Sequence, residues 1–231
     1  TKGTQEEVVL ENDQIAVTFS TKGAEITKVE LKEFKTWDQR PLVLLDNESS
    51  DLSYSIQTDK GLLSLNEFYF NPTLSSTEVE GTPVSIITFI AKAGNGSITR
   101  TYSLAEGGFV LDKTLEFTGL SSSLKDTLVQ INWDDKLIRQ EQDIEESRRK
   151  TNINFFTSAG SHDYLSATSE EANEEVTEPL KWVSFSQRFF TTGIIAADNF
   201  NAAKLNQQTP SDTLSIKNVQ VGLSLPLVDN K

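Results

Sequence analysis

The most restrictive feature of this chain is an alternation of apolar and polar residues with a period of two. Ile15, Val17 and Phe19 alternate with polar or small neighbours, and the same pattern returns over residues 214–227. Successive side chains of a β-strand point to opposite faces of the sheet, so such segments are typical of strands with one buried face. The pattern predicts an all-β fold.

Turn residues separate the alternating segments at intervals of roughly 8–12 residues, which is typical of a sandwich or barrel. The clearest hairpin joins residues 84–92 to residues 97–104 through Gly94-Asn95-Gly96, because Asn and Gly tolerate the positive φ of a tight turn. Further strands are predicted for residues 8–10, 15–19, 24–31, 41–45, 109–117, 128–133, 152–156 and 214–227. We therefore predict mostly antiparallel strands, at most short helical segments, and one domain over residues 1–231.

Several segments depart from simple alternation. The apolar positions of residues 24–31 change parity, which predicts a β-bulge or kink near Thr27-Lys28. Asn71-Pro72 predicts a turn or loop. Residues 134–150 are densely charged and favour either a frayed helix or an ordered surface loop, and residues 169–178 favour an acidic loop.

The charge balance restricts the partners of the protein. The chain holds 21 basic and 34 acidic residues, a formal net charge of −13. Such a surface repels phosphates and anionic lipid headgroups, which argues against nucleic-acid binding and against a peripheral membrane anchor. No run approaches the roughly 18 consecutive apolar residues of a membrane span. Because the chain also lacks Met, we expect it to be an excised or processed part of a longer protein.

Residues that carry chemistry are scarce. The chain has no Cys and a single His, His162, so disulfides, a zinc site and a cofactor site are not expected, and calcium stays open because carboxylates are plentiful. His162 is predicted to lie in a surface loop, where its neighbours Ser161 and Asp163 point away from it. Asp134-Asp135 at a strand end stay open as paired carboxylates, although such pairs arise by chance in an acidic chain.

Residues 181–197 are the most hydrophobic stretch, and their spacing predicts a strand, one helical turn and a second strand. Trp182, Phe185, Phe189 and Phe190 lie in this stretch. These rings either line a groove for a hydrophobic ligand or fill the core, and burial of such side chains is the main driving force of folding. Both interpretations stay open from the sequence.

Ordered strings along the chain resemble a known family. Residues 8–26 resemble the entry to a galactose-mutarotase-like β-supersandwich, and more narrowly the large periplasmic domain of YidC-type membrane protein insertases of the Bacteroidetes branch. Residues 31–44 and residues 98–103 are similar to the same family. The most specific string is residues 181–190, where a Trp-Val pair precedes Gln187 and a following Phe. The resemblance covers essentially the whole chain.

The resemblance implies a setting and partners. Insertases of this type carry membrane helices on both sides of this domain, which lies at the periplasmic face of the inner membrane, and their C-terminal junction extends beyond what this chain shows. The domain assists insertion and folding as an accessory element, and its implied partners are Sec translocon components and nascent membrane proteins. The candidate partner-binding residues are Trp182, Phe185, Gln187, Phe189 and Phe190.

The resemblance in fold to sugar epimerases implies an alternative function, that of an aldose-epimerase-like or carbohydrate-binding domain. Epimerases of this fold resemble acid–base catalysts that use a Glu and His residues around a sugar ring, and proton transfer needs such poised groups. With His162 alone, that set cannot be built. Because fold does not carry function across, we predict a non-enzymatic interaction domain.

Overall fold

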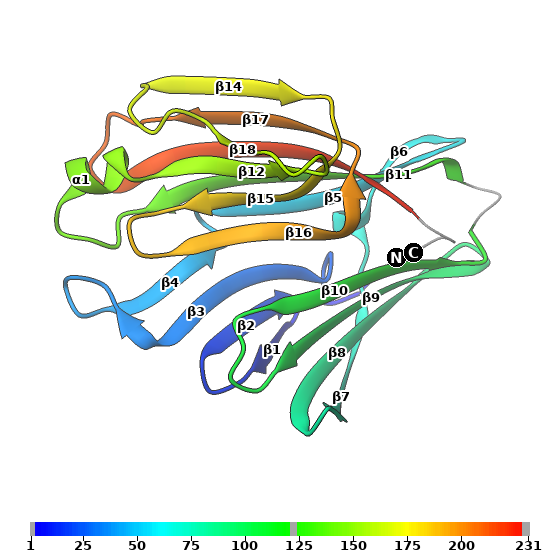
Figure 1. Cartoon of the computed structure of the whole chain (residues 1–231). Helices are drawn as coiled ribbons and strands as arrows, with labels where there is room; N and C mark the ends of the chain where they lie inside the picture. Colours follow the sequence, from blue (N-terminus) through cyan, green and yellow to red (C-terminus); the bar gives the residue numbers. More distant parts are fainter. Residues whose placement is uncertain (1–2, 121–123, 228–231) are drawn as a thin grey trace.

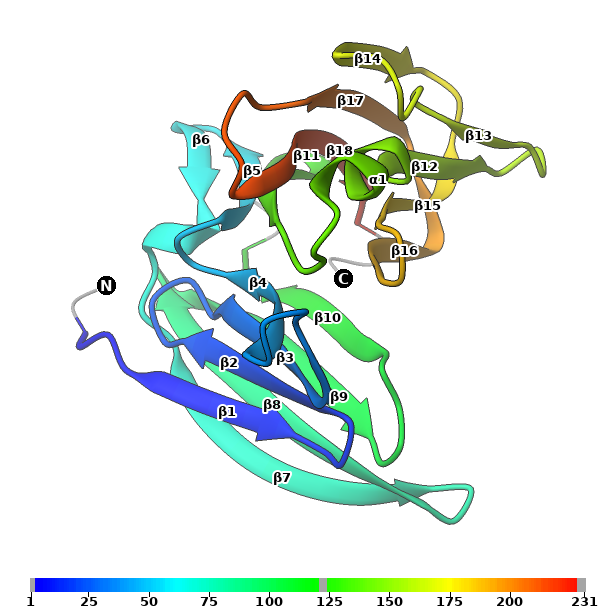
Figure 2. The ribbon, with the colours of Figure 1, turned by 90° about the vertical axis from the view of Figure 1, so that its left-hand side faces the viewer.

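The computed structural model describes residues 3–120 and 124–227, and these residues form four sheets in two sandwiches (Figures 1 and 2). Every strand pairing among them is antiparallel. The prediction of an all-β fold with mostly antiparallel strands and short helical segments is confirmed.

The first sandwich pairs two four-stranded sheets. One sheet has the order β1-β2-β3-β4 and the other the order β10-β9-β8-β7. The strands are β1 (Glu7–Glu11), β2 (Ile15–Ser20), β3 (Glu25–Lys35), β4 (Pro41–Asp46), β7 (Asn71–Val79), β8 (Thr82–Ala93), β9 (Gly96–Ala105) and β10 (Leu111–Thr118). The Phe19 ring of β2 meets Phe89 of β8 and Tyr102 of β9, with centroids 5.6 and 4.6 Å apart, so these rings join the two layers.

The second sandwich pairs a six-stranded sheet, β14-β17-β18-β11-β5-β6, with a four-stranded sheet, β13-β12-β15-β16. The strands are β5 (Ser50–Thr58), β6 (Gly61–Ser64), β11 (Leu124–Ile138), β12 (Asn152–Thr157), β13 (His162–Tyr164), β14 (Glu171–Val176), β15 (Leu180–Ser186), β16 (Thr191–Phe200), β17 (Ala202–Gln208) and β18 (Ser215–Pro226). A 3-10 turn, η1 (Leu65–Glu67), and one helix, α1 (Ile144–Arg149), complete the elements. None of the described helices has the length and apolar character needed to cross a membrane.

A buried cation joins the two sandwiches. Arg100 of β9 is fully buried, and its Nη1 donates to the Gly23 carbonyl at 2.5 Å. Its guanidinium lies 4.7 Å from the ring centroid of Tyr54 in β5, and the Lys113 ammonium lies 3.2 Å from the same centroid. Burial lowers the pKa of Lys113 well below its usual value. The strands of the first sandwich are thereby tied to the six-stranded sheet of the second.

The β2–β3 turn is shaped to meet this cation. Gly23 has φ +78°, a left-handed conformation in which a Cβ would collide with the Glu25 side chain. Ala24 also has a positive φ, and its carbonyl accepts a hydrogen bond from the Tyr102 hydroxyl at 2.9 Å. The turn thus presents two successive carbonyls to Arg100 and Tyr102, which compensates for the strained backbone of Ala24.

Two local predictions are confirmed. Thr18 pairs with Lys28 and Phe19 pairs with Ile26, which leaves Thr27 as the extra residue of a β-bulge. The predicted hairpin over residues 84–104 is formed by β8 and β9. Both predictions rest on changes of parity or on turn residues, which act locally.

Other local predictions are wrong. Asn71-Pro72 do not form a turn but begin β7, an edge strand on which a proline costs no ladder hydrogen bond. The acidic stretch of residues 169–178 is not a loop, since it contains β14, which pairs with β17 at the edge of the six-stranded sheet. An exposed edge strand needs few apolar residues, so its composition resembles that of a loop.

The predicted end of alternation after Trp133 is also wrong. β11 continues to Ile138, with Asp135 and Leu137 buried and the charged Asp134 and Lys136 exposed. Only the later part of residues 134–150 is helical, as the short α1. The predicted strand over residues 109–117 begins at Leu111.

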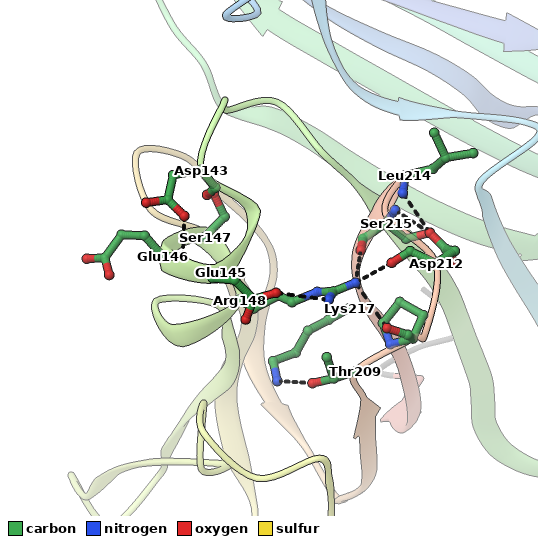
Figure 3. A network of polar contacts seen from close by, with 11 residues as sticks. Asp143, Glu145, Glu146, Ser147, Arg148, Thr209, Asp212, Leu214, Ser215 and Lys217 are labelled. Atoms are coloured by element: carbon green, nitrogen blue, oxygen red, sulfur yellow. Dashed lines mark hydrogen bonds and ion pairs between the residues drawn. The ribbon is translucent and has the colours of Figure 1, made fainter.

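Helix α1 is fixed to the loop between β17 and β18 by one arginine (Figure 3). The Asp143 carboxylate caps the helix by accepting from the Glu146 N–H at 2.9 Å. Nη2 of Arg148 donates to the carbonyls of Pro210, Asp212 and Ser215. Two carbonyls of the loop and the carbonyl of the first residue of β18 therefore share a single donor group.

A buried lysine lies beneath the same loop. Lys217 is fully buried in β18, and its Nζ donates to the Thr209 hydroxyl and the Ala167 carbonyl, both at 3.0 Å (Figure 3). Burial lowers the pKa of Lys217, and the charge of Arg148 lowers it further. Neutral oxygen acceptors make most of the contacts of both cations, and the Glu145 carboxylate lies 3.5 Å from Nη1 of Arg148. The network is therefore a structural support for the loop.

Replacing Arg148 with Ala leaves three carbonyls without their shared donor. We expect the free energy of unfolding to fall by about 2–3 kcal/mol, measured by urea denaturation. Arg149→Ala is the matched control, because that exposed side chain pairs with Glu146 at the surface and its loss costs under about 0.5 kcal/mol. Equal losses in the two variants would contradict this role of Arg148.

Candidate functional site

The candidate residues lie on β15, on β16 and in the turn between them. The two predicted strands are confirmed, but the predicted helical turn is wrong: Gln187 donates its backbone N–H to the Phe190 carbonyl at 2.7 Å and closes a short non-helical turn. Because side chains alternate along a strand, β15 sends neighbouring residues to opposite faces of the sheet. The five candidates are thereby separated into a core residue, an outer-face residue and three turn residues.

Phe185 belongs to the core. Its side chain is fully buried, and its ring lies 4.4 Å from that of Trp133 in the facing sheet. This contact joins the two layers of the second sandwich. The folded domain does not present Phe185 to a partner, so the interpretation that these rings fill the core holds for this residue.

Trp182 lies on the outer face of the four-stranded sheet. It pairs across the strands with Phe156 on one side and with Ile195 on the other, and Phe156 in turn pairs with His162. The Trp182 and Phe156 rings are stacked, with centroids 5.9 Å apart, and the His162 ring lies 5.9 Å from Trp182. Four cross-strand neighbours, His162, Phe156, Trp182 and Ile195, thus form an outer row.

His162 lies on this row and not in a loop, so that part of the prediction is wrong. It begins the short strand β13, it is exposed, and its Nε2 lies 3.2 Å from Oδ1 of the Asn154 amide. Its other contacts are the rings of Trp182 and Tyr164. These partners orient an imidazole but do not form an acid–base pair with it.

The turn residues reach an aromatic hairpin of the first sandwich. Phe189 is 63% exposed, with the Arg188 guanidinium 5.0 Å from its ring centroid. Phe190 is partly buried and meets Phe34 of β3 edge to face, with centroids 5.6 Å apart. Gln187 is partly buried and contributes the backbone bond that closes the turn.

The hairpin between β3 and β4 adds a further exposed ring. Trp37 is 46% exposed, its backbone N–H donates to the Gln140 carbonyl at 3.1 Å, and the Arg139 guanidinium lies 5.4 Å from the centroid of its ring. The hairpin and the β15–β16 turn lie at the same end of the molecule, at the left of Figure 1 and toward the viewer in Figure 2. We call Phe34, Trp37, Phe189 and Phe190, with Arg139 and Arg188, the aromatic end surface.

Sequence reasoning missed Phe34 and Trp37 as members of this surface. Both occupy a segment that alternates poorly, and Phe34 is 41% exposed although it lies within β3. A single large apolar residue at the surface is ordinary, but several that gather at one end of a molecule are not. The sequence feature that could have indicated this surface is a pair of aromatic residues among charged neighbours, near the tip of a predicted hairpin.

One buried and one partly buried carboxyl have strongly raised pKa values, as the acids of an active site often do. Burial and the neighbouring Asp46 carboxylate raise the pKa of Asp135 to about 8, against a hydrogen bond from Ser50 that lowers it. Burial raises the pKa of Glu25 to about 7, and the charge of Arg100 opposes the rise. The two carboxyls lie in different sheets, and Asp134 points to solvent while Asp135 points inward. Asp134-Asp135 therefore do not form a carboxylate pair.

Metal ligands do not converge anywhere in the described parts of the chain. No group of three or more His, Asp or Glu side chains there could hold a metal ion. The arrangement at the aromatic end surface consists of exposed rings, guanidinium groups and a turn, which suit contact with apolar or aromatic groups of a partner.

The division of the candidate residues can be tested by two substitutions of the same type. We expect Phe185→Ala to lower the free energy of unfolding by roughly 3–5 kcal/mol, because it opens a cavity beneath Trp133. Phe189→Ala, at an exposed position, should change it by less than about 0.5 kcal/mol. Urea denaturation measures both, and a large loss for Phe189→Ala would place that ring in the core.

The buried Asp135 predicts a pH dependence of stability. A carboxyl whose pKa is raised on folding contributes stability that is present below its ordinary pKa near 3.8 and is lost as the pH rises through about 8. The free energy of unfolding should therefore fall between pH 5 and pH 8. Asp135→Asn, which cannot ionise, should be more stable than the unchanged chain at pH 8 by roughly 1–3 kcal/mol. An equal free energy of unfolding at pH 5 and pH 8, measured by urea denaturation, would contradict the burial of this charge.

Comparison with known proteins assigns the chain to a family. A family model described as YidC periplasmic domain matches residues 7–229. The chain is 34% identical to the membrane protein insertase YidC of Cytophaga hutchinsonii over 83% of this chain and 30% of that protein. It is 30% identical to the same protein of Porphyromonas gingivalis over 98% of this chain and 36% of that protein. The chain thus spans about a third of the length of these curated relatives.

A solved structure has the same fold. A galactose mutarotase-like protein from Lactobacillus casei matches with a TM-score of 0.52 and 9% identity, covering 94% of this chain and 87% of that one. At this identity the likeness shows the fold alone, and it confirms the predicted β-supersandwich. The predicted family is confirmed as well: the chain belongs to the YidC periplasmic domains, the periplasmic part of inner-membrane protein insertases.

Proposed function

We propose that this domain is a non-catalytic interaction domain, which assists insertion and folding by contacting other polypeptides through its aromatic end surface. The observation that carries the proposal is the exposure of Phe34, Trp37 and Phe189 at one end of the molecule. Exposure of several rings to water is unfavourable in free energy, and contact with a partner removes this apolar surface from water.

The composition of the surface suits transient contact with polypeptides. Arg139 and Arg188 lie over the rings of Trp37 and Phe189, so that cation and ring share one patch. Aromatic residues and Arg are the types enriched at protein interfaces. The remainder of the chain carries a strong negative charge, with a formal value of −13 for the whole chain, which discourages nonspecific association elsewhere.

The partners that we propose are segments of nascent membrane proteins and components of the Sec translocon. The relatives are named membrane protein insertases, and an insertase meets apolar segments before they enter the bilayer. We further propose that residues 1–231 act as one unit, since the buried apolar residues of both sandwiches form a continuous cluster. In this proposal the membrane is reached only through helices outside this chain.

An aldose-epimerase-like activity or carbohydrate binding is the second candidate function, and the fold alone favours it. The contacts of His162 speak against the enzyme, because its partners are an amide and aromatic rings. Incubation with aldoses followed by polarimetry tests this alternative, and the proposal requires that the rate of mutarotation stays at the uncatalysed value.

The proposed contact is tested by cross-linking in native membranes with the full-length insertase. A photoreactive amino acid in place of Phe189 or Trp37 should cross-link to nascent membrane proteins or to Sec components. The control is the same amino acid at Leu62, which is 67% exposed on β6, away from the aromatic end surface (Figure 1). Equal adducts at Phe189, Trp37 and Leu62 would refute the assignment of the surface.

A further inference from the structure

Strand β16 is a free edge of the four-stranded sheet. It pairs with β15 on one side, and no described strand pairs with its other side. The bond from the Gln187 N–H to the Phe190 carbonyl makes these two residues a hydrogen-bonded pair of the hairpin. In an antiparallel hairpin, such pairs alternate with pairs whose N–H and C=O groups point away from the partner strand. Thr191, Gly193 and Ile195 occupy these outward positions, in pairs with Ser186, Ser184 and Trp182.

The outward backbone groups of these three residues, at every second position of β16, therefore lack a strand partner among the described residues. Thr191, Gly193 and Ile195 are also exposed, and the Ile195 side chain is 72% exposed. An unpaired row of N–H and C=O groups at strand spacing is a template for an added strand. Only an extended polypeptide backbone supplies donors and acceptors at the same spacing.

The other sheet edges in the described structure carry features that prevent such pairing. Charged residues or proline occur in β1, β4, β7, β10, β13 and β14, and β6 has only four residues. β16 carries one charge, Asp198, near its end, and residues 191–197 form an uncharged, proline-free run that is longer than any in the other edge strands. Natural proteins protect free edges with charge, proline or short length, so the open edge of β16 is an exception that needs a reason.

The side chains next to this edge define the chemistry of a partner. Ile195 begins the outer row that continues through Trp182 and Phe156, so a strand added beside β16 would extend this row with its own outward side chains. Gly193 lies close against β15, where an added Cβ would lie 2.9 Å from the Ser184 Cβ. Because it has no side chain, its backbone on the edge is not covered. Apolar, uncharged side chains suit both features.

We infer that β16 binds an extended, uncharged and apolar segment of another polypeptide by adding it as a fifth strand next to the outer row. This inference rests on the proposed function, because it describes how an apolar client segment would be held beside the aromatic end surface. A second copy of the chain fits less well, since two chains of formal charge −13 repel each other.

The test uses this chain with a fluorescein-labelled peptide of alternating valine and threonine as the probe. Fluorescence anisotropy should show saturable binding, and Ile195→Lys should weaken it by at least about tenfold, because a charge would face the added strand. Leu74→Lys is the matched control: Leu74 is an exposed apolar residue on the edge strand β7, and this variant should bind as the unchanged chain does. Circular dichroism confirms that both variants are folded.

A second measurement tests the backbone pairing directly. The same peptide with alternate amides N-methylated should lose binding, and hydrogen exchange should show protection of Thr191, Gly193 and Ile195 when the unmodified peptide is bound. Equal binding of the two peptides, or equal effects of the two lysine variants, would overturn the inference. Sedimentation that shows a dimer dissociated by Ile195→Lys would also overturn it, because the occupant would be a second copy.

The two proposals can fail separately. Loss of peptide binding at β16 with preserved cross-links at Phe189 would overturn strand addition and leave the proposed function standing. Preserved peptide binding without any cross-link to a client or Sec component would overturn the proposed function, and β16 would then bind extended segments of some other origin.

Discussion

The alternation of side chains along β15 is the constraint on which the aromatic end surface depends. Because successive residues point to opposite faces, Phe185 enters the core against Trp133, while Trp182 lies on the outer row beside Phe156. A displacement of one residue in register would exchange these two faces and bury the wrong side. The core contact therefore fixes both the outer row and the position of the turn that carries Phe189.

The joint between the sandwiches completes the surface. Arg100 and Lys113 tie the first sandwich to Tyr54 of the six-stranded sheet, and the Phe34 ring meets Phe190 across the same junction. Residues from distant parts of the chain thus form one aromatic end surface. Arg100, which is fully buried, offsets its desolvation through the Gly23 carbonyl and the Tyr54 ring.

Local patterns predicted the fold well, because strand alternation and turn residues act over short distances. The bulge at Thr27 followed from a change of parity, and the hairpin of β8 and β9 followed from its glycines. β7 and β14 were missed because edge strands exposed to water resemble loops in composition. The membership of Phe34 and Trp37 could not be predicted, since it depends on how two sandwiches meet.

We propose that the exposed rings at one end of this domain make contacts with partners and do not hold the fold together. A comparison of the full-length insertase with a variant carrying Trp37→Ser and Phe189→Ser tests this, by quantitative mass spectrometry of the nascent membrane proteins and Sec components that co-purify with it. We expect the amount of co-purifying protein to fall several-fold in the variant, while the unfolding midpoint of the domain is unchanged. Unchanged co-purification in a folded variant would contradict it.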